Sequence, residues 1–204
     1  MARNRAADFA QRREIIIENA VRLFANAGFL GVSVADLAKA CKTSKSLIYH
    51  YFDSKEDILF EAMDSHVRTL WDAASGIIAM DVSPDHKLRT LTHAMMHLYA
   101  GAASRHKVLV NELYHLPRER REVIIGRQSR LVQAVADIFS LLQPEFRSKP
   151  ELTKPAAMVF FGMINWTHTW YDPAGPASTD AVADLVVDMV LNGVRGAQLV
   201  PRRS

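Results

Sequence analysis

The sequence predicts an all-α protein of about nine helices, with a three-helix N-terminal head at residues 1–53 and a larger helical body at residues 54–204. Apolar residues recur at spacings of three and four along most of the chain, and prolines separate these segments. No stretch shows the alternation of a half-buried strand. The 204 residues, 49% of them hydrophobic, are enough to bury a substantial core.

The first expected helix carries an apolar stripe and ends at Gly28, a residue that favours helix termination. The stripe consists of Ile16, Ala20, Leu23, Phe24 and Ala27. Ahead of it, a basic arm is formed by Arg3, Arg5, Arg12 and Arg13. This arm suits a contact to nucleic acid and a solvated tail about equally well.

Two short helices follow, each opened by a serine. Ser33 caps a helix that starts at the next residue, and Asp36 completes a capping box. Residues 41–43 supply a tight connection, and Ser44 caps a second helix over residues 44–51. This spacing is typical of a helix-turn-helix, whose second helix enters the major groove of DNA.

The second short helix presents side chains that suit a DNA surface. Leu47 and Tyr51 are expected to pack inward. The polar side chains on the other faces are Lys45, Ser46, Tyr49 and His50. The lysine offers a cation for phosphate, and the first-turn Lys45 and Ser46 are candidates for base contacts. Taken alone, the pattern also fits an ordinary amphipathic helix pair with a solvated face.

The body begins with a long helix and continues with helices separated by prolines. Ser54 and Asp57 form a second capping box that opens the long helix. Its apolar face consists of Leu59, Met63, Val67, Leu70 and Ala74. The next apolar repeat consists of Leu88, Leu91, Met95, Leu98 and Ala102. A third repeat follows Pro117 and consists of Ile124, Leu131, Val135, Ile138 and Leu142. Pro144 and Pro150 are expected to bracket a loop.

The last two expected helices, over residues 153–170 and from Ser178 onward, are strongly apolar. Such a surface needs cover, either from the protein's own core or from a second copy.

Charge is distributed unequally between head and body, since residues 1–52 carry a net charge of +4 and residues 53–204 a net charge of −1. The overall net charge of +3 is too small to indicate nucleic-acid binding by itself, so the concentration of positive charge in the head matters more than the total.

Three stretches of the head, ADLAKA, SKSLIYHYF and SKEDIL, resemble the DNA-binding region of the TetR family of bacterial transcriptional regulators. The resemblance implies that the residues facing a double-stranded operator are Ser44, Lys45, Ser46, Tyr49, His50 and Lys55. Ser33 and Lys42 complete the predicted DNA-binding set. Lys42 stands where the family usually has Gly, so we expect a positive φ, modest strain and a weak phosphate contact there.

The family resemblance also implies a homodimer in which the last two long helices pair across a two-fold axis. Two recognition helices about 34 Å apart would then read successive major-groove faces of a palindromic operator.

Residues 160–175, FFGMINWTHTWYDPAG, place Trp166 and Trp170 one helical turn apart among polar side chains. Such tryptophans suit a ligand pocket, although core or dimer packing is the commoner explanation of an aromatic stripe. The segment is similar to an NWT-x-TW-type motif of TetR regulators of fatty-acid and aromatic-acid degradation, and residues 106–117 resemble a second segment of that subgroup. This implies an acyl-CoA thioester as the effector, with phenylacetyl-CoA favoured and fatty acyl-CoA next. The predicted ligand-binding residues are Tyr99, Arg105, His106, Asn111, Glu112, Arg127, Phe160, Asn165, Trp166, Thr169 and Trp170.

Several alternatives remain at this point. A sensor of varied lipophiles that controls an efflux pump would need no CoA, and an acyl-CoA thioesterase would need measurable turnover. We expect no enzyme and no cofactor, because no phosphate-binding glycine loop, nucleophile elbow or paired-cysteine motif is present. His93 and His97 could hold a metal with His106 or His115, but two histidines do not make a site, so we predict none.

The cysteine count and the lack of long apolar segments indicate the cellular compartment. Cys41 is the single cysteine, which excludes an internal disulfide framework. No segment has the length of a membrane span or the form of a signal peptide, so we expect a cytoplasmic protein without a membrane partner.

Overall fold

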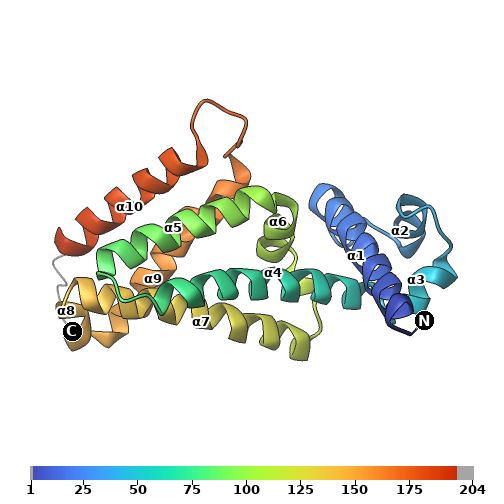
Figure 1. Ribbon diagram of the computed structural model, residues 1–204, viewed down its shortest axis with the longest axis horizontal. Coiled ribbons are helices and arrows are strands. Elements are labelled where there is room, and N and C mark those ends of the chain that lie inside the picture. Colours follow the sequence, from blue (N-terminus) through green and yellow to red (C-terminus); the bar gives the residue numbers. More distant parts are fainter. Residues whose placement is uncertain (1, 197–204) are drawn as a thin grey trace. The chain divides into compact units, whose positions relative to one another are not determined.

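The computed structural model describes residues 2–196 and consists there of helices without a strand (Figure 1). The α-helices are α1 (Ala2–Ala27), α2 (Val34–Ala40), α3 (Lys45–Tyr51), α4 (Lys55–Ile78), α5 (Pro84–Gly101), α6 (Ala103–Asn111), α7 (Arg118–Leu142), α8 (Glu145–Ser148), α9 (Pro150–Asn165) and α10 (Thr179–Gly196). The 3₁₀ helices are η1 (Leu113–His115) and η2 (Trp166–Thr169). The all-α prediction is confirmed.

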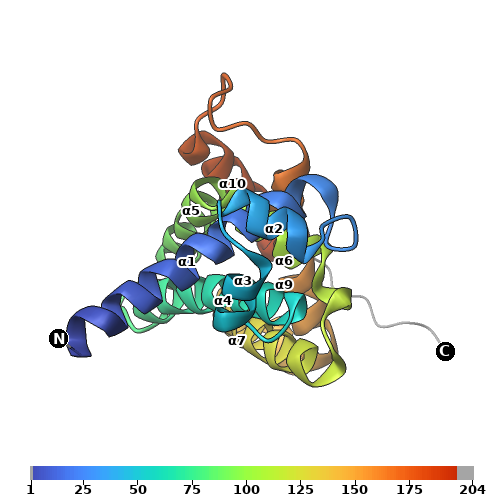
Figure 2. The same cartoon turned by 90° about the vertical axis from the view of Figure 1, so that its right-hand side faces the viewer.

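The chain divides into two compact units at places other than the boundary expected at residue 53. The first unit comprises residues 1–68 and 102–125, and the second comprises residues 69–101 and 126–204. Figure 2 shows α1, α2 and α3 grouped in the first unit. The long helix α4 therefore belongs to both units.

The core of the first unit explains why it extends beyond the three head helices. Phe24, Leu37 and Ile48 of those helices are buried in one cluster with Leu59 of α4 and Ile124 of α7. Residues 108–124 thus complete a core that the head helices do not close alone. A 3.6-residue period identifies which face of a helix is apolar but not which partner covers it.

The caps expected from the sequence are present. The backbone N–H of Asp36 donates to Ser33 Oγ at 3.2 Å, and the Ser33 N–H donates back to the Asp36 carboxylate at 2.9 Å. Ser44 caps α3, and the hydroxyl of Ser54 accepts from Asp57 N–H at 3.1 Å. Each cap satisfies backbone donors that a helix start leaves open.

Gly28 ends the first helix in the expected way. It adopts a φ of +73° immediately after α1, and its N–H donates to the carbonyl of Phe24. The left-handed conformation costs glycine little, because glycine has no Cβ.

The second unit is built around α5, α7, α9 and α10. Figure 1 shows α10 running beside α5. Leu88, Met95, Phe139 and Phe160 are fully buried in the core between these helices.

Two expectations for the second unit are corrected. The segment between Pro144 and Pro150 is not a loop, because residues 145–148 form α8 and bury Phe146 at 3% exposure. The helix expected at residues 153–170 begins three residues earlier, at Pro150, and ends at Asn165. It continues as the 3₁₀ helix η2, in which residues four apart no longer share a face.

Candidate DNA-binding surface and ligand site

The helix α3 presents a polar face to solvent and fastens its other face to the core of the first unit. Ile48 is 1% exposed, and Phe52, directly after the helix, is also buried. Leu47 and Tyr51, which were expected to pack inward, are only half-buried, so the buried face lies one position further along the chain than predicted. The exposed side chains are the predicted Ser44, Lys45, Ser46, Tyr49 and His50.

The turn between α2 and α3 has the conformation expected for a position that usually holds glycine. Lys42 has a φ of +52°, and its side chain is exposed. The neighbouring Thr43 N–H donates to the carbonyl of Ala38 at 2.9 Å, which closes the turn. A lysine in this region carries strain that glycine would avoid.

Ser33 has a structural part in this arrangement. Its hydroxyl donates to the Asp36 carboxylate at 2.5 Å, and this hydrogen bond, together with that from the Ser33 N–H, lowers the pKa of Asp36. The hydroxyl predicted to approach DNA is therefore engaged in capping α2.

The N-terminal half of α1 supports the recognition helix rather than forming a free basic arm. Arg13 donates to the carbonyl of Tyr51 at 2.7 Å, pairs with Glu61 at 3.1 Å and lies 4.3 Å from the centre of the Phe52 ring. Phe9 packs against Tyr51 with ring centres 4.7 Å apart. Arg3 and Arg5 lie within α1, but their side chains are outside the described residues.

Lys55 was predicted to face the operator, but its ammonium group is turned into the first unit. It donates to the carbonyls of Phe29 and Val32, each at 2.7 Å, and lies over the Phe29 ring. This side chain joins the start of α4 to the turn before α2. We therefore remove it from the expected DNA contacts.

The predicted ligand-binding residues of the first unit are engaged in intramolecular contacts. Arg105 pairs with Glu14 of α1 and donates to Ser65 Oγ. His106 is 2% exposed, and its Nδ1 lies 3.5 Å from Nε2 of His66. Arg105 is thus an ion-pair partner in this structure rather than an open cation.

Glu112 is likewise engaged within the first unit. Its carboxylate accepts the N–H of Phe29 at 3.2 Å and lies 3.3 Å from His115 Nε2. Asn111, beside it in the chain, is exposed.

The predicted aromatic slot of the second unit is divided between core and surface. Tyr99 and Phe160 are buried, whereas Trp166 and Trp170 are 64% and 59% exposed. The change from α9 to η2 rotates Trp170 away from the face it would share with Trp166 in a continuous α-helix. The other predicted members, Arg127, Asn165 and Thr169, range from half-buried to exposed.

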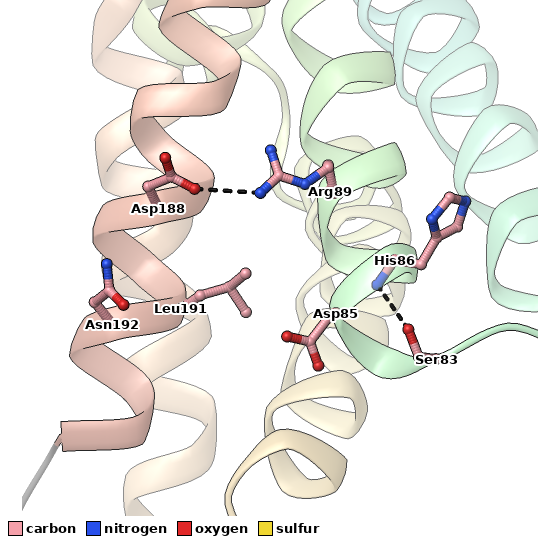
Figure 3. Close-up of a pocket in the computed structure, with 7 residues that line it drawn as sticks. All are labelled: Ser83, Asp85, His86, Arg89, Asp188, Leu191 and Asn192. Atoms are coloured by element: carbon pink, nitrogen blue, oxygen red, sulfur yellow. Dashed lines mark hydrogen bonds and ion pairs between the residues drawn. The ribbon is translucent and has the colours of Figure 1, made fainter.

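A cavity of about 430 Å³ lies between the first turns of α5 and the C-terminal half of α10 (Figure 3). Its lining consists of Ser83, Asp85, His86, Arg89, Asp188, Leu191 and Asn192. None of the predicted ligand-binding residues lines it. Its lining is mostly polar, so it does not resemble the apolar slot that an acyl group requires.

The same two helices are joined by a row of paired side chains, which we call the α5–α10 ladder. Its members are Arg89, His93 and His97 of α5 and Asp180, Asp184 and Asp188 of α10. The members follow one another at four-residue intervals, and the order on one helix is the reverse of the order on the other. The pairing register is therefore that of two antiparallel helices.

The distances in the ladder are short. Arg89 lies 2.7 Å from Asp184, His93 lies 2.9 Å from Asp184 and 3.0 Å from Asp180, and His97 lies 2.7 Å from Asp180. Partial burial lowers the pKa of His93, but the hydrogen bonds that it donates to the Asp184 and Asp180 carboxylates outweigh burial and raise the pKa overall. Hydrogen bonds from His97 and His93 lower the pKa of Asp180. Sequence reasoning considered both histidines but missed the carboxylates, which lie more than 80 residues away.

Among the described residues, no helix is long and apolar enough to cross a membrane.

Comparison with known proteins agrees with this arrangement. Residues 16–62 match the family described as bacterial regulatory proteins, tetR family, and residues 81–194 match the tetracyclin repressor-like C-terminal domain. The HTH-type transcriptional repressor KstR2 of Mycolicibacterium smegmatis is 25% identical over 97% of this chain and 98% of its own length.

Solved structures show the same likeness. A TetR-family regulator from Bordetella parapertussis 12822 has a TM-score of 0.86 and 35% identity, covering 92% of this chain and 98% of that one. AibR, solved in complex with isovaleryl coenzyme A and operator DNA, has a TM-score of 0.76 and 27% identity, covering 87% and 97%. The matched families and named relatives are regulators rather than enzymes, and this chain belongs to the TetR family of DNA-binding transcriptional regulators.

Proposed function

We propose that this protein is a homodimeric repressor that occupies a palindromic operator when empty and leaves it when an acyl-CoA thioester binds. The observation that carries the effector part is the similarity to AibR, which was solved with isovaleryl coenzyme A and operator DNA. KstR2, which is similar over nearly the whole chain, is named a transcriptional repressor, and this supports repression rather than activation.

The exposed face of α3 supports the DNA contact. Lys45 and Tyr49 project from a helix whose opposite side is anchored by Ile48 in the core. The N-terminal end of α3, which Ser44 caps, is exposed. This end attracts phosphate through the helix dipole. Operator DNA lies in the cytoplasm of a bacterium, which is where we expect this regulator to act.

Exposed apolar side chains on the last two long helices support the dimer. They are Met158 and Val159 on α9 and Leu185 and Met189 on α10, each more than half exposed. Leu185 and Met189 are one helical turn apart and form a continuous apolar strip. A second copy of the same surface would cover it, as in an isologous two-fold interface.

For the acyl group, we retain phenylacetyl-CoA as the favoured effector and fatty acyl-CoA as the next. The likeness to AibR adds isovaleryl-CoA to the compounds that need testing. The assignment of particular residues to thioester binding remains a prediction.

The test is binding of the purified protein to DNA from its own promoter region, followed by fluorescence anisotropy. The complex is titrated with phenylacetyl-CoA, isovaleryl-CoA, a long-chain acyl-CoA, free phenylacetate, CoA and several lipophiles that lack CoA. Release by a thioester but not by CoA or the free acid would support the proposal and identify the acyl class. Release by varied lipophiles instead would favour a sensor that controls an efflux pump, and the absence of release by any compound would contradict the proposal.

Two tyrosines supply a matched pair for the DNA part of the test. Tyr49→Ala truncates a 53% exposed side chain on α3, and Tyr114→Ala truncates an 80% exposed side chain on η1 of the same unit. The first should weaken operator binding about tenfold or more, while the second should leave it unchanged. Equal effects of the two substitutions would remove Tyr49 from the interface.

A further inference from the structure

We propose that the α5–α10 ladder contains a zinc site formed by His93, His97 and Asp180. Each of these residues offers one ligand atom, and the three atoms lie within 4.8 Å of one another. The two imidazoles lie at positions i and i+4 of α5, and the carboxylate comes from the first turn of α10. The proposal is independent of the identity of any effector.

The donor atoms are near the positions that a tetrahedral ion requires. Asp180 Oδ1 lies 3.0 Å from His93 Nδ1 and 2.7 Å from His97 Nε2. A tetrahedral Zn²⁺ with bonds of about 2.0–2.1 Å holds its ligand atoms about 3.3 Å apart. Entry of an ion therefore requires Asp180 Oδ1 to move away from His93 Nδ1 by about 0.3 Å and from His97 Nε2 by about 0.6 Å, which rotation about the side-chain bonds supplies.

A second group of contacts orients the histidine that would bind through Nδ1. His93 Nε2 lies 2.9 Å from Asp184 Oδ1, so this nitrogen carries the proton when Nδ1 holds the ion. Arg89 donates to the same carboxylate oxygen at 2.7 Å and fixes its position. Metal-binding histidines usually donate their second ring N–H to a carboxylate or carbonyl in this way.

The chemistry of the donor set selects the class of ion. Two imidazole nitrogens favour Zn²⁺, Co²⁺ or Ni²⁺ over Mg²⁺ and Ca²⁺, which prefer oxygen ligands. The side chains of His97 and Asp180 are 56% and 61% exposed, so solvent reaches the cluster and can supply a fourth ligand. The ion would link α5 to α10 and thereby stabilise the second unit against unfolding.

The site is separate from the surface proposed for dimerisation. Met189 follows Asp180 by two and a half turns of α10, since an α-helix has about 3.6 residues per turn. The two side chains therefore point to opposite sides of the helix. A second copy seated on Leu185 and Met189 would leave the histidines and the aspartate accessible.

The experiment uses the full-length protein without a polyhistidine tag, stripped of metal by a chelator. Zn²⁺ binding is measured by isothermal titration calorimetry, and Co²⁺ is added in parallel because its visible absorption reports four-coordinate nitrogen and oxygen ligation. We expect saturation at one ion per chain and no binding of Mg²⁺. The thermal midpoint of unfolding should rise in the presence of Zn²⁺.

Three substitutions and one control assign the ion to its ligands. His97→Ala and Asp180→Asn each remove a ligand and should lower the Zn²⁺ affinity more than about a hundredfold, whereas Asp184→Asn should cost about 10–100-fold by loosening His93. His86→Ala is the matched control, because His86 lies on the same helix and its ring points away from α10 (Figure 3). Circular dichroism checks that each variant is folded.

The proposal fails if the native chain does not bind Zn²⁺ at one ion per chain. It also fails if His97→Ala retains the affinity and the Co²⁺ spectrum of His86→Ala. In either case the ladder is a set of hydrogen bonds and ion pairs that only joins the two helices.

Discussion

The ammonium group of Lys55 lies 4.0 Å from the centre of the Phe29 ring. The same group donates hydrogen bonds to the carbonyls of Phe29 and Val32, two residues in the turn between α1 and α2. These carbonyls follow the end of α1, and that of Phe29 also accepts the N–H of Val32 at 3.3 Å. One lysine from α4 therefore holds the turn that positions the two helices of the DNA-binding motif.

Lys55→Met should destabilise the first unit without changing the electrostatics of DNA binding. It removes two hydrogen bonds from a charged donor, which we expect to lower the free energy of unfolding by about 2 kcal/mol. Urea denaturation measures the change, with the exposed Lys45→Met as a control that should be nearly neutral. A stable Lys55→Met protein with a reduced salt dependence of DNA binding would return Lys55 to the DNA surface.

Lys45→Ala should change the salt dependence of DNA binding but not the stability of the protein. Loss of one phosphate contact reduces the slope of log K against log salt concentration by about 0.9 and leaves stability nearly unchanged. The slope is obtained from binding isotherms at several salt concentrations. Lys107→Ala, an exposed lysine of α6 in the same unit, serves as the control. If both variants keep the native slope, Lys45 makes no phosphate contact.

Lys42 allows backbone strain to be separated from side-chain charge. Lys42→Gly relieves the left-handed strain at a φ of +52° but adds freedom to the unfolded chain, so stability should rise by about 0.5–1 kcal/mol. Lys42→Ala keeps the strain and removes the charge, so it should not stabilise the protein. Urea denaturation compares the two, and equal stability of both variants would argue against strain at this turn.

The buried His66 predicts acid sensitivity of the first unit. Burial, and then the nearby Arg105 guanidinium, lower its pKa from an ordinary 6.5 to about 4. Between these values the unfolded chain binds a proton that the folded chain does not. The free energy of unfolding should therefore fall as the pH drops from about 6.5 to about 4, by up to about 3 kcal/mol, and this contribution should not change further below that range.

Urea denaturation at pH 7 and pH 4.5 measures this effect. His66→Gln removes the titrating group while retaining a polar side chain next to His106, and it should show a smaller loss of stability in acid. His50→Gln, at an exposed position of α3, should behave like the native chain. An unchanged acid response in His66→Gln would assign the sensitivity to other groups.

Met189→Glu should disrupt the proposed homodimer. It places a charge in the apolar strip of α10, where pairing with a second copy would leave it desolvated and unpaired. Sedimentation velocity at micromolar concentration should show the mass of one chain for this variant and of two chains for the native protein. Met80→Glu, at a methionine 43% exposed beyond α4, is the matched control and should remain a dimer.

Features that depend on neighbouring residues could be read from the sequence. The capping box joins Ser33 to Asp36 across three positions, and the positive φ of Lys42 follows from the turn it occupies. The exposed polar face of α3 was also predicted, although Ile48 rather than Leu47 is its buried anchor. Local hydrogen bonds and helical periodicity determine these features almost independently of the remaining fold.

The contacts that redefined the predicted sites join distant residues. Arg105 was expected to bind the ligand but pairs with Glu14, 91 positions earlier, and Glu112 accepts from Phe29, 83 positions earlier. A charged side chain in a sequence does not indicate which of many distant partners it will meet. The tryptophans illustrate a second limit, because the change to a 3₁₀ helix at Trp166 depends on the packing of the finished fold and not on the aromatic spacing.

The four-residue spacing of the α5–α10 ladder also restricts how these helices can slide. Its acidic and basic members repeat every four residues, so α10 finds a new set of partners on α5 only after moving by about 6 Å, at about 1.5 Å per residue. In the observed register Asp184 lies between Arg89 and His93, and a shift by half that distance would move it away from one of them. A full shift that moves Asp180 toward Arg89 would leave Asp188 and His97 without their present partners. The ladder therefore favours discrete positions of α10 along α5, and in the position observed in this structure every member has a partner.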